Sequence, residues 1–529
     1  MIMKKLIFLV LFFPLFSCND WLDVESEVSV TYRNYFQSEQ DIEDIFITIL
    51  GNEKKIFAPL SQEPFDWTAM YCDDVADDVK GYRNLEWSAY SSSRGNYTNW
   101  KNMYAIIYLA NMLEENRNRF QNVSEERINY WIAQANFFKG LMYFELARRW
   151  GEAPIAPATE DASAQAKSPV DTVLAYAIRA AEAALVLPKY DQLTDASGAA
   201  VTSRQFASIG SVRTLLANIY AWMGGLHGEN KYWEKAEEQA SLVIDGKAGA
   251  YSLVSMKDLV EKTLGSARDV TEVIHAIEMN GQDDDRYYQG SFWNSYPGFA
   301  LFNYPYTTTD FEKIEDAVKE TRISVAKVRE LYNDMNDLRI KEYWKNLGEP
   351  IPITQINSET QKLDTIRWFY PNFAYLNKWR EAIYSVNPDV NLGDRPLIGM
   401  ESNRVYWRLA DLILLRAECR AHLDNADAVK DLNRIRERAG LMEYVGSTVK
   451  EDLLREIFNE RDRELFGETC RYYDVVRFGY YRELLEGNFK TLTESDVKEG
   501  ALYYPVSQNA FNKNTLMKQN TYWSWHLQD

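Results

Sequence analysis

The stretch that decides the fold is residues 406–440, which read YWRLADLILLRAECRAHLDNADAVKDLNRIRERAG. Small and aliphatic side chains recur in it at three- and four-residue intervals, which is the period of an amphipathic helix. The positions that fall near the spacing of a tetratricopeptide-like hairpin are Ala417, Ala428, Leu432 and Ile435. The stretch therefore predicts two helices, at about 403–422 and 425–438, that pack against each other.

The same periodicity extends the helical prediction over much of the chain. A second hairpin is expected within 212–245, with a longer turn through glycines. Gly151 and Pro154 are stop signals, so the helix before them should end near Gly151. A single helical pair would leave its apolar face exposed, so several pairs must pack together. Further helices are expected at about 170–187, 205–224, 231–245 and 449–466.

Two long regions, 61–98 and 255–402, lack this periodicity and are expected to be irregular and rich in loops. Within the second, nine of the twenty residues of 287–306 are aromatic, and its glycines and prolines forbid a continuous helix. Rings on loops can stack on sugar faces or grip peptide side chains, although they can also simply pack a loop onto helices. The candidate ligand contacts here are Tyr288, Trp293, Asn294 and Tyr296.

The segment 65–90 combines aromatic residues with carboxylates. Its candidate ligand contacts are Trp67, Asp73, Tyr82, Arg83 and Trp87. Paired carboxylates are also compatible with a glycosidase, although Asp pairs in loops are mostly solvated or capping residues. Carboxylate density alone would permit a structural calcium ion at Asp73–Asp78 or Asp283–Asp285, without the spacing of an EF-hand loop.

The N-terminus has the pattern of an export signal. Met1 to Lys5 carry two positive charges, and an apolar run from Leu6 to Phe16 leads to Cys18. This pattern looks like a bacterial lipoprotein signal, in which residues 1–17 are removed and the Cys18 thiol receives a lipid. An ordinary signal peptide with a chance cysteine is the alternative. Residues 18–40 would then form the lipid anchor and tether.

Composition excludes several classes of function. The chain has 529 residues, with 59 Lys and Arg against 78 Asp and Glu, so its net charge is −19. Such a surface repels nucleic-acid phosphates. The four cysteines and four histidines show neither a disulfide framework nor a metal-binding spacing, and no nucleotide-binding or GxSxG motif is present. We therefore expect no enzyme, no metal site and no nucleic-acid partner.

Several motifs taken together resemble the SusD/RagB-type nutrient-binding outer-membrane lipoproteins of the Bacteroidetes. The resemblance runs from end to end, with Lys139-Gly140 as a mild departure from the usual Arg-Ala. The matching stretches are Cys18–Asp23, Ala135–Pro154, Tyr406–Glu418, Leu432–Gly440, Ile457–Leu465, Arg471–Arg477 and Tyr504–Tyr522. Charged residues in these motifs are expected to brace helices as ion pairs rather than to form a catalytic cluster. They are Arg461, Glu464, Arg471, Asp474 and Arg477.

The resemblance implies an all-α dominated fold with minor β structure, in which about four tetratricopeptide-like hairpins support a loop-rich ligand face. It implies one domain over 41–529, with an N-terminal part (41–250), a central insertion (255–402) and a C-terminal part (403–529). It also implies a cell-surface, lipid-anchored outer-membrane receptor that needs no cofactor. Such a receptor captures oligosaccharides and delivers them to a SusC-like TonB-dependent barrel. Oligopeptide capture is the alternative, and a surface hydrolase or a purely structural scaffold is less favoured.

Overall fold

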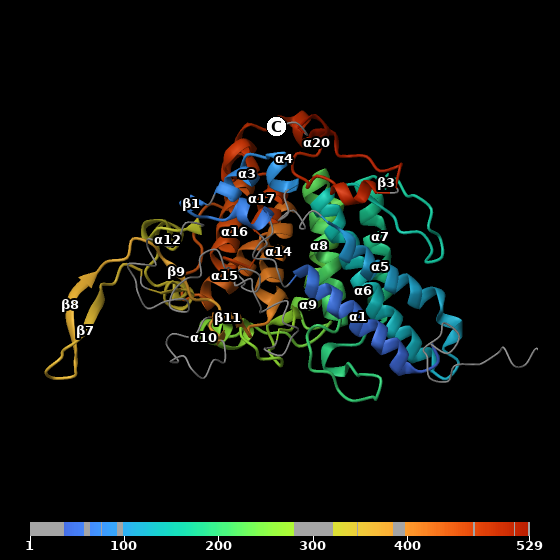
Figure 1. The fold of residues 1–529 in the computed structure, drawn as a ribbon, viewed down its shortest axis with the longest axis horizontal. Coiled ribbons are helices and arrows are strands. Elements are labelled where there is room, and N and C mark those ends of the chain that lie inside the picture. Colours follow the sequence, from blue (N-terminus) through green and yellow to red (C-terminus); the bar gives the residue numbers. More distant parts are fainter. Residues whose placement is uncertain are drawn as a thin grey trace, which may run out of the picture.

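The computed structural model describes residues 36–57, 64–75, 77–91, 99–279, 321–345, 347–384, 397–468, 471–512 and 514–526. The predicted signal sequence, Cys18 and most of the tether lie outside these residues, as does the aromatic stretch 287–306. In the described part, helices dominate and the strands are short, as predicted (Figure 1). No helix in the described residues is both long enough and apolar enough to cross a membrane.

The helices follow the chain in this order: α1 (Glu39–Phe57), α2 (Pro64–Ala69), α3 (Asp77–Arg83), α4 (Trp87–Ser91), α5 (Lys101–Glu115), α6 (Glu125–Trp150), α7 (Val170–Ala183), α8 (Ile209–His227), α9 (Asn230–Ile244), α10 (Met256–Asp258), α12 (Val325–Leu331), α13 (Leu338–Tyr343), α14 (Leu409–His422), α15 (Ala428–Arg438), α16 (Lys450–Glu464), α17 (Arg471–Arg477), α18 (Tyr481–Leu484), α19 (Glu494–Lys498) and α20 (Thr521–Trp525).

The strands form antiparallel pairs, β1 with β5, β2 with β3, β4 with β12, β6 with β9, β7 with β8, and β10 with β11. Their bounds are β1 (Asp74–Val75), β2 (Ala153–Pro154), β3 (Lys167–Ser168), β4 (Val273–Ile277), β5 (Thr321–Arg322), β6 (Trp344–Lys345), β7 (Ile351–Ile356), β8 (Leu363–Phe369), β9 (Tyr375–Leu376), β10 (Ala382–Tyr384), β11 (Leu397–Met400) and β12 (Arg404–Arg408).

Both predicted helical hairpins are present. α8 packs on α9 and α14 packs on α15, and α14 also contacts α9 and α16, which joins the two hairpins. In Figure 1 the helices α1, α5, α6 and α7 form one side of the molecule, and α8, α9 and α14 lie between them and α15 and α16. The helices therefore form one continuous framework across the described residues.

Local sequence signals set the ends of the longest helix. Ser124 caps the start of α6 by accepting a hydrogen bond from the backbone N–H of Arg127 at 3.3 Å. Gly151 ends it with a φ of 70°, in the left-handed region that favours glycine. The predicted end of this helix near Gly151 is confirmed.

Two other glycines allow helices to approach closely. A Cβ atom at Gly140 of α6 would lie 3.0 Å from the backbone of α7, and one at Gly224 of α8 would lie 2.5 Å from the Trp233 ring of α9. Gly140 in the Lys139-Gly140 departure therefore has a packing role, because a Cβ at this position would force the α7 backbone to shift by a few tenths of an ångström.

The predicted helix at 403–422 is wrong at its start. Residues Arg404–Arg408 form β12, which pairs with β4, and the helix α14 begins only at Leu409. Trp407 lies opposite His275, and both side chains are buried. Pairing with a strand some 130 residues earlier in the chain thus overrides the local helical pattern.

The regions predicted to be irregular contain more regular structure than expected. In 61–98 the described residues form α2, α3, α4 and β1, and in 255–402 they form α10, α12, α13 and the strands β4 to β11. The elements are short, most of them two to seven residues. Part of the 255–402 region packs with Cys72 around a second hydrophobic core that includes Tyr343, Trp344 and Trp379, whereas Phe65, Tyr82 and Tyr90 belong to the first core.

Candidate functional site

The segment 65–90 is held against the C-terminal part of the framework. α2 contacts α17, and α3 contacts the short 3₁₀ helix at Gly487–Thr491. Phe65 lies in a stack between Tyr472 and Tyr504, with ring centroids 3.9 and 3.7 Å away. The start of the segment is therefore anchored by aromatic packing, which fixes the position of the predicted ligand residues that follow.

Tyr82 and Arg83 lie inside the protein, with only 5% and 8% of their surface exposed. The Tyr82 ring meets the Tyr90 ring edge to face at 5.2 Å. The Arg83 guanidinium donates to the carbonyl oxygen of Met70 at 3.1 Å and to Cys72 Sγ at 3.3 Å. Both side chains thus brace the segment and leave little surface for a ligand.

Trp87 and Asp73 are more accessible. Trp87 is half-buried, and its ring centroid lies 6.3 Å from that of Trp523 in α20. Asp73 is exposed and its carboxylate accepts a hydrogen bond from the backbone N–H of Ser324. Part of the Trp87 ring is therefore accessible at the surface. Asp73 links the 65–90 segment to Ser324 of the central insertion.

The strand pair β1–β5 joins the 65–90 segment to the chain that begins at residue 321. Asp74 lies opposite Arg322 and Val75 opposite Thr321, and the isolated bridge between Ser324 and Phe373 ties the following residues to a later part of the central insertion. Figure 1 shows β1 beside α12 at the edge of the helical framework. The described chain that begins at residue 321 is therefore fixed beside the 65–90 segment.

Other predicted residues lie where the structure gives less information. Trp67 belongs to α2. The remaining candidates, together with the lipidation site, lie outside the described residues, and their roles stay predictions. They are Cys18, Tyr288, Trp293, Asn294 and Tyr296.

The calcium hypothesis also stays a prediction. Over the residues that the structure describes, no three His, Cys, Asp or Glu side chains gather as metal ligands would. Asp283–Asp285 lie outside those residues. Asp73, in the other proposed position, has a backbone N–H as its hydrogen-bond partner.

The charged residues singled out in the C-terminal motifs do brace helices. Arg461 of α16 binds the Asp474 carboxylate of α17 through two hydrogen bonds of 3.0 Å. Arg477 binds Glu418 of α14 at 2.7 and 2.6 Å and also reaches Asp474. The two arginines hold the pKa of the Asp474 carboxyl below its usual range although burial acts in the opposite direction. The predicted ion pairs between helices are thus confirmed for Arg461, Asp474 and Arg477.

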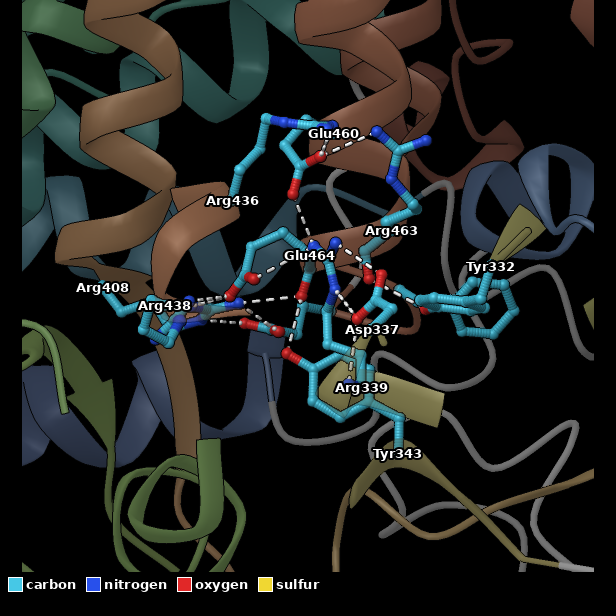
Figure 2. Close-up of polar contacts among 12 residues, drawn as sticks. Tyr332, Asp337, Arg339, Tyr343, Arg408, Arg436, Arg438, Glu460, Arg463 and Glu464 are labelled. Atoms are coloured by element: carbon cyan, nitrogen blue, oxygen red, sulfur yellow. Dashed lines mark hydrogen bonds and ion pairs between the residues drawn. The ribbon is translucent and has the colours of Figure 1, made fainter. Parts of the chain in front are cut away.

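A second buried network ties the central segment to α16 (Figure 2). Arg339 of α13 donates to Asp337 at 2.8 Å and to Glu460 at 2.7 Å. Glu464, one turn further along α16, accepts from Arg408 at 2.7 Å and also pairs with Arg438. The buried carboxylates of this network thus form ion pairs with arginines, which is typical of residues that stabilise the fold rather than of a general acid or base.

The polar cavity between α6, α14, α16 and α17 is small. It measures about 50 Å³, and Arg148, Tyr406, Asp411 and Tyr473 are among the residues that line it. Ligand pockets usually measure about 300–1,000 Å³, whereas this cavity has room for only a few water molecules. It therefore offers no place for a sugar ring.

Sequence reasoning missed one group of exposed aromatic residues. Trp368 and Tyr370 are 55% and 65% exposed, and they lie on and directly after β8 in a region that was predicted to be irregular. The β-branched and aromatic residues of 351–356 and 363–370, separated by the polar run 357–362, are a signal for a β-hairpin that could have placed both rings on a strand.

Comparisons with known proteins agree on one family. A model described as "SusD family" matches residues 245–523, and one described as "Starch-binding associating with outer membrane" matches residues 20–204. SusD-like protein P25 of Formosa agariphila is 23% identical over 92% of this chain and 91% of its own length. The starch-binding protein SusD of Bacteroides thetaiotaomicron is 26% identical over 31% of this chain and 27% of its own.

Solved structures show the same fold. A SusD homolog from Bacteroides thetaiotaomicron superposes with a TM-score of 0.70 at 21% identity, over 92% of this chain and 99% of that one. NanU of B. fragilis superposes with a TM-score of 0.66 at 18% identity, over 94% and 99% of the two chains. Since the first family model alone covers more than half of the sequence, the chain belongs to the SusD family.

Proposed function

We propose that this protein is a lipid-anchored receptor on the outer surface of the outer membrane that captures oligosaccharides and passes them to a SusC-like TonB-dependent barrel. The observation that carries the proposal is the match of both halves of the chain to this family, with an N-terminal model described as starch-binding and outer-membrane-associated. The lipoprotein pattern that ends at Cys18 supports the anchoring.

The arrangement of the described residues supports binding rather than catalysis. The buried carboxylates of α14, α16 and α17 are paired with arginines, so they are poorly suited to act as a general acid or base. The β1–β5 pair holds the described chain that follows the second aromatic-rich region beside the 65–90 segment, at the edge of the helical framework. Stacking on rings and hydrogen bonds to amide groups then suffice to hold a sugar chain.

Isothermal titration calorimetry of the mature protein against oligosaccharides of starch, xylan, laminarin and galactomannan tests the proposal. We expect binding to at least one of them. Replacing Trp87 or Trp293 by Ala should weaken this binding by about 2 kcal/mol each if the rings are anchors. Tyr108→Ala is the matched control, because Tyr108 of α5 is 49% exposed and lies outside both predicted regions. Binding to peptides but to no glycan would instead favour the oligopeptide alternative.

Lipidation is tested separately by the substitution Cys18→Ala. We expect labelled palmitate to enter the wild-type protein and not the variant, and the variant to leave the membrane fraction. A variant that stayed membrane-bound and labelled would contradict the anchoring part of the proposal.

A further inference from the structure

The β7–β8 hairpin extends away from the body of the molecule. Its two strands pair only with each other among the strands of the described residues, and Figure 1 shows the hairpin projecting beyond β9 and α12. A two-stranded ribbon in water is marginally stable and gains little from its own packing. Exposed aromatic residues on such a ribbon therefore do not serve a core.

The register places the two exposed rings on one face. Trp368 lies opposite Pro352 near the end of β8, and Tyr370 is the first residue after the strand, two residues from Trp368. The alternation of side chains along an extended chain then puts both rings on the same side of the ribbon. Trp368 is 55% exposed and Tyr370 is 65% exposed. Pro352 of β7 is also exposed, as is Pro350, which lies directly before that strand and two residues from Pro352 and so shares this face. We call these four residues, Pro350, Pro352, Trp368 and Tyr370, the hairpin platform.

Hydroxyl groups continue the same face. Thr354 follows Pro352 by two residues and pairs with Thr365, and both are exposed. A register shift between Ile353 and Thr354 leaves Ile366 as the extra residue on β8. A ligand that stacks on the rings would therefore meet two hydroxyl groups that can donate and accept hydrogen bonds.

The platform carries no charge. The charged neighbours Asp364 and Arg367 adjoin Thr365 and Trp368 in sequence, so the alternation of the strand directs them to the opposite face. On a chain whose net charge is −19, an uncharged aromatic face is complementary to an uncharged ligand rather than to a cationic partner.

The size of the platform favours a small ligand over a protein. Aromatic side chains bury about 150–250 Å² each when fully covered, so two rings that are just over half exposed offer on the order of 250 Å². A stable protein interface needs about 800 Å² from each partner. Rings two residues apart on a strand are separated by about 7 Å, which lets them contact neighbouring units of one extended chain.

We propose that the hairpin platform is a second carbohydrate-binding surface, formed by other residues than the 65–90 and 287–306 regions, that stacks an uncharged glycan chain. The proposal rests on the proposed function, since it assumes the same class of ligand. Its role is to hold the distal part of a long chain while the first surface holds another part, so that the two sites act together on polymers.

The test compares variants of the full mature chain. Trp368→Ala, Tyr370→Ala and the double variant are titrated with the longest oligosaccharide that the wild-type protein binds, and run in native gels that contain soluble starch, xylan, laminarin or galactomannan. We expect the double variant to bind the polysaccharide at least tenfold more weakly, with Trp368→Phe retaining most of the affinity. Tyr108→Ala is the control, and unchanged melting temperatures show that the framework is intact.

The outcomes separate this inference from the proposed function. Wild-type affinity in the double variant, with glycan binding still reduced by Trp293→Ala, would overturn the hairpin platform and leave the proposed function standing. Failure of the wild-type protein to bind any of these glycans would overturn both. An equal loss of affinity in Tyr108→Ala would also count against the platform, because the effect would not be specific to the hairpin.

Discussion

Buried charged side chains stabilise the fold of this chain through ion pairs with one another. Glu464 lies among Arg438, Arg408, Arg339 and Lys378, and these cations lower the pKa of its carboxyl to about 2 although burial alone would raise it. Lys378 is itself fully buried, and the loss of water around its ammonium lowers its pKa to about 8. The stability of the buried ion-pair network drawn in Figure 2 therefore depends on all its charged partners being present together.

The substitution Glu464→Gln should lower the free energy of unfolding at neutral pH. It should also make that free energy depend less on pH in the acid range. Because the folded-state pKa is about 2 and the ordinary value is 4.5, the carboxylate stabilises the fold above pH 4.5, and this contribution is lost as the pH falls towards 2. A shift of this size corresponds to about 3 kcal/mol, and removing one partner of a buried pair costs about 3–5 kcal/mol. Urea unfolding at several pH values measures both effects.

Glu483→Gln is the control for this prediction. Glu483 pairs with Arg455 at the surface, with 60% of its side chain exposed, so its removal should change the free energy of unfolding by less than about 1 kcal/mol. An equal loss of stability in both variants would contradict the assignment of Glu464 to a buried network.

At the level of elements, glycines set how closely the helices pack. Gly224 allows α8 to lie directly against Trp233 of α9, whose ring is stacked at 4.0 Å on the imidazole of His422 from α14. Burial lowers the pKa of His422 to about 4, so the imidazole is neutral in this stack at pH 7. Three helices from two hairpins thus meet at one contact.

Gly224→Ala should destabilise this contact. The added methyl would lie 2.5 Å from the Trp233 ring, and overpacking of this kind costs about 1–3 kcal/mol. Gly51→Ala is the matched control, because Gly51 lies in α1 and a Cβ there meets nothing within 4 Å. In that open helical position alanine should stabilise the protein by about 0.5–1 kcal/mol. Thermal unfolding of both variants checks that the melting temperature falls for Gly224→Ala and rises for Gly51→Ala.

The elements also show how far the sequence could predict the structure. Stop signals placed the end of α6 at Gly151, because capping is a local property. The strand β12 was missed because its partner β4 lies far away in the sequence. Tyr82 and Arg83 were chosen for their residue types, but burial depends on contacts with Tyr90 and Met70 that form only in the folded chain. The hairpin platform was overlooked within a region assigned to loops.

The whole molecule combines an acidic surface with cores joined by charge networks. Three hydrophobic clusters are present in the described residues, one that runs from the N-terminal helices into the C-terminal part, one around the central segment and one between α14, α15 and α16. Arg339 and Arg408 connect the second to the third through Glu460 and Glu464. The buried ionised side chains thus occur in ion pairs, while the uncharged rings of the hairpin platform lie at the surface.

If the ligand is an uncharged glycan, its affinity should be almost independent of salt. Raising NaCl from 50 to 500 mM should change the dissociation constant by less than about twofold, because screening acts on interactions between charges. A polyanion such as heparin is the control, and the net charge of −19 should keep it from binding at low salt. Calorimetry at both salt concentrations measures this, and a steep salt dependence would indicate a charged ligand.

The pairing of β5 with β1 and of β4 with β12 has a consequence for how the sequence of this chain could diversify. The chain on either side of residues 280–320 is clamped to the framework, at Val273–Ile277 and at Thr321–Arg322. Closing a longer insert between fixed ends costs only about 0.6 kcal/mol per doubling of its length. The intervening stretch can therefore be replaced by one of different length and composition, while the flanking strands and the helical framework stay the same.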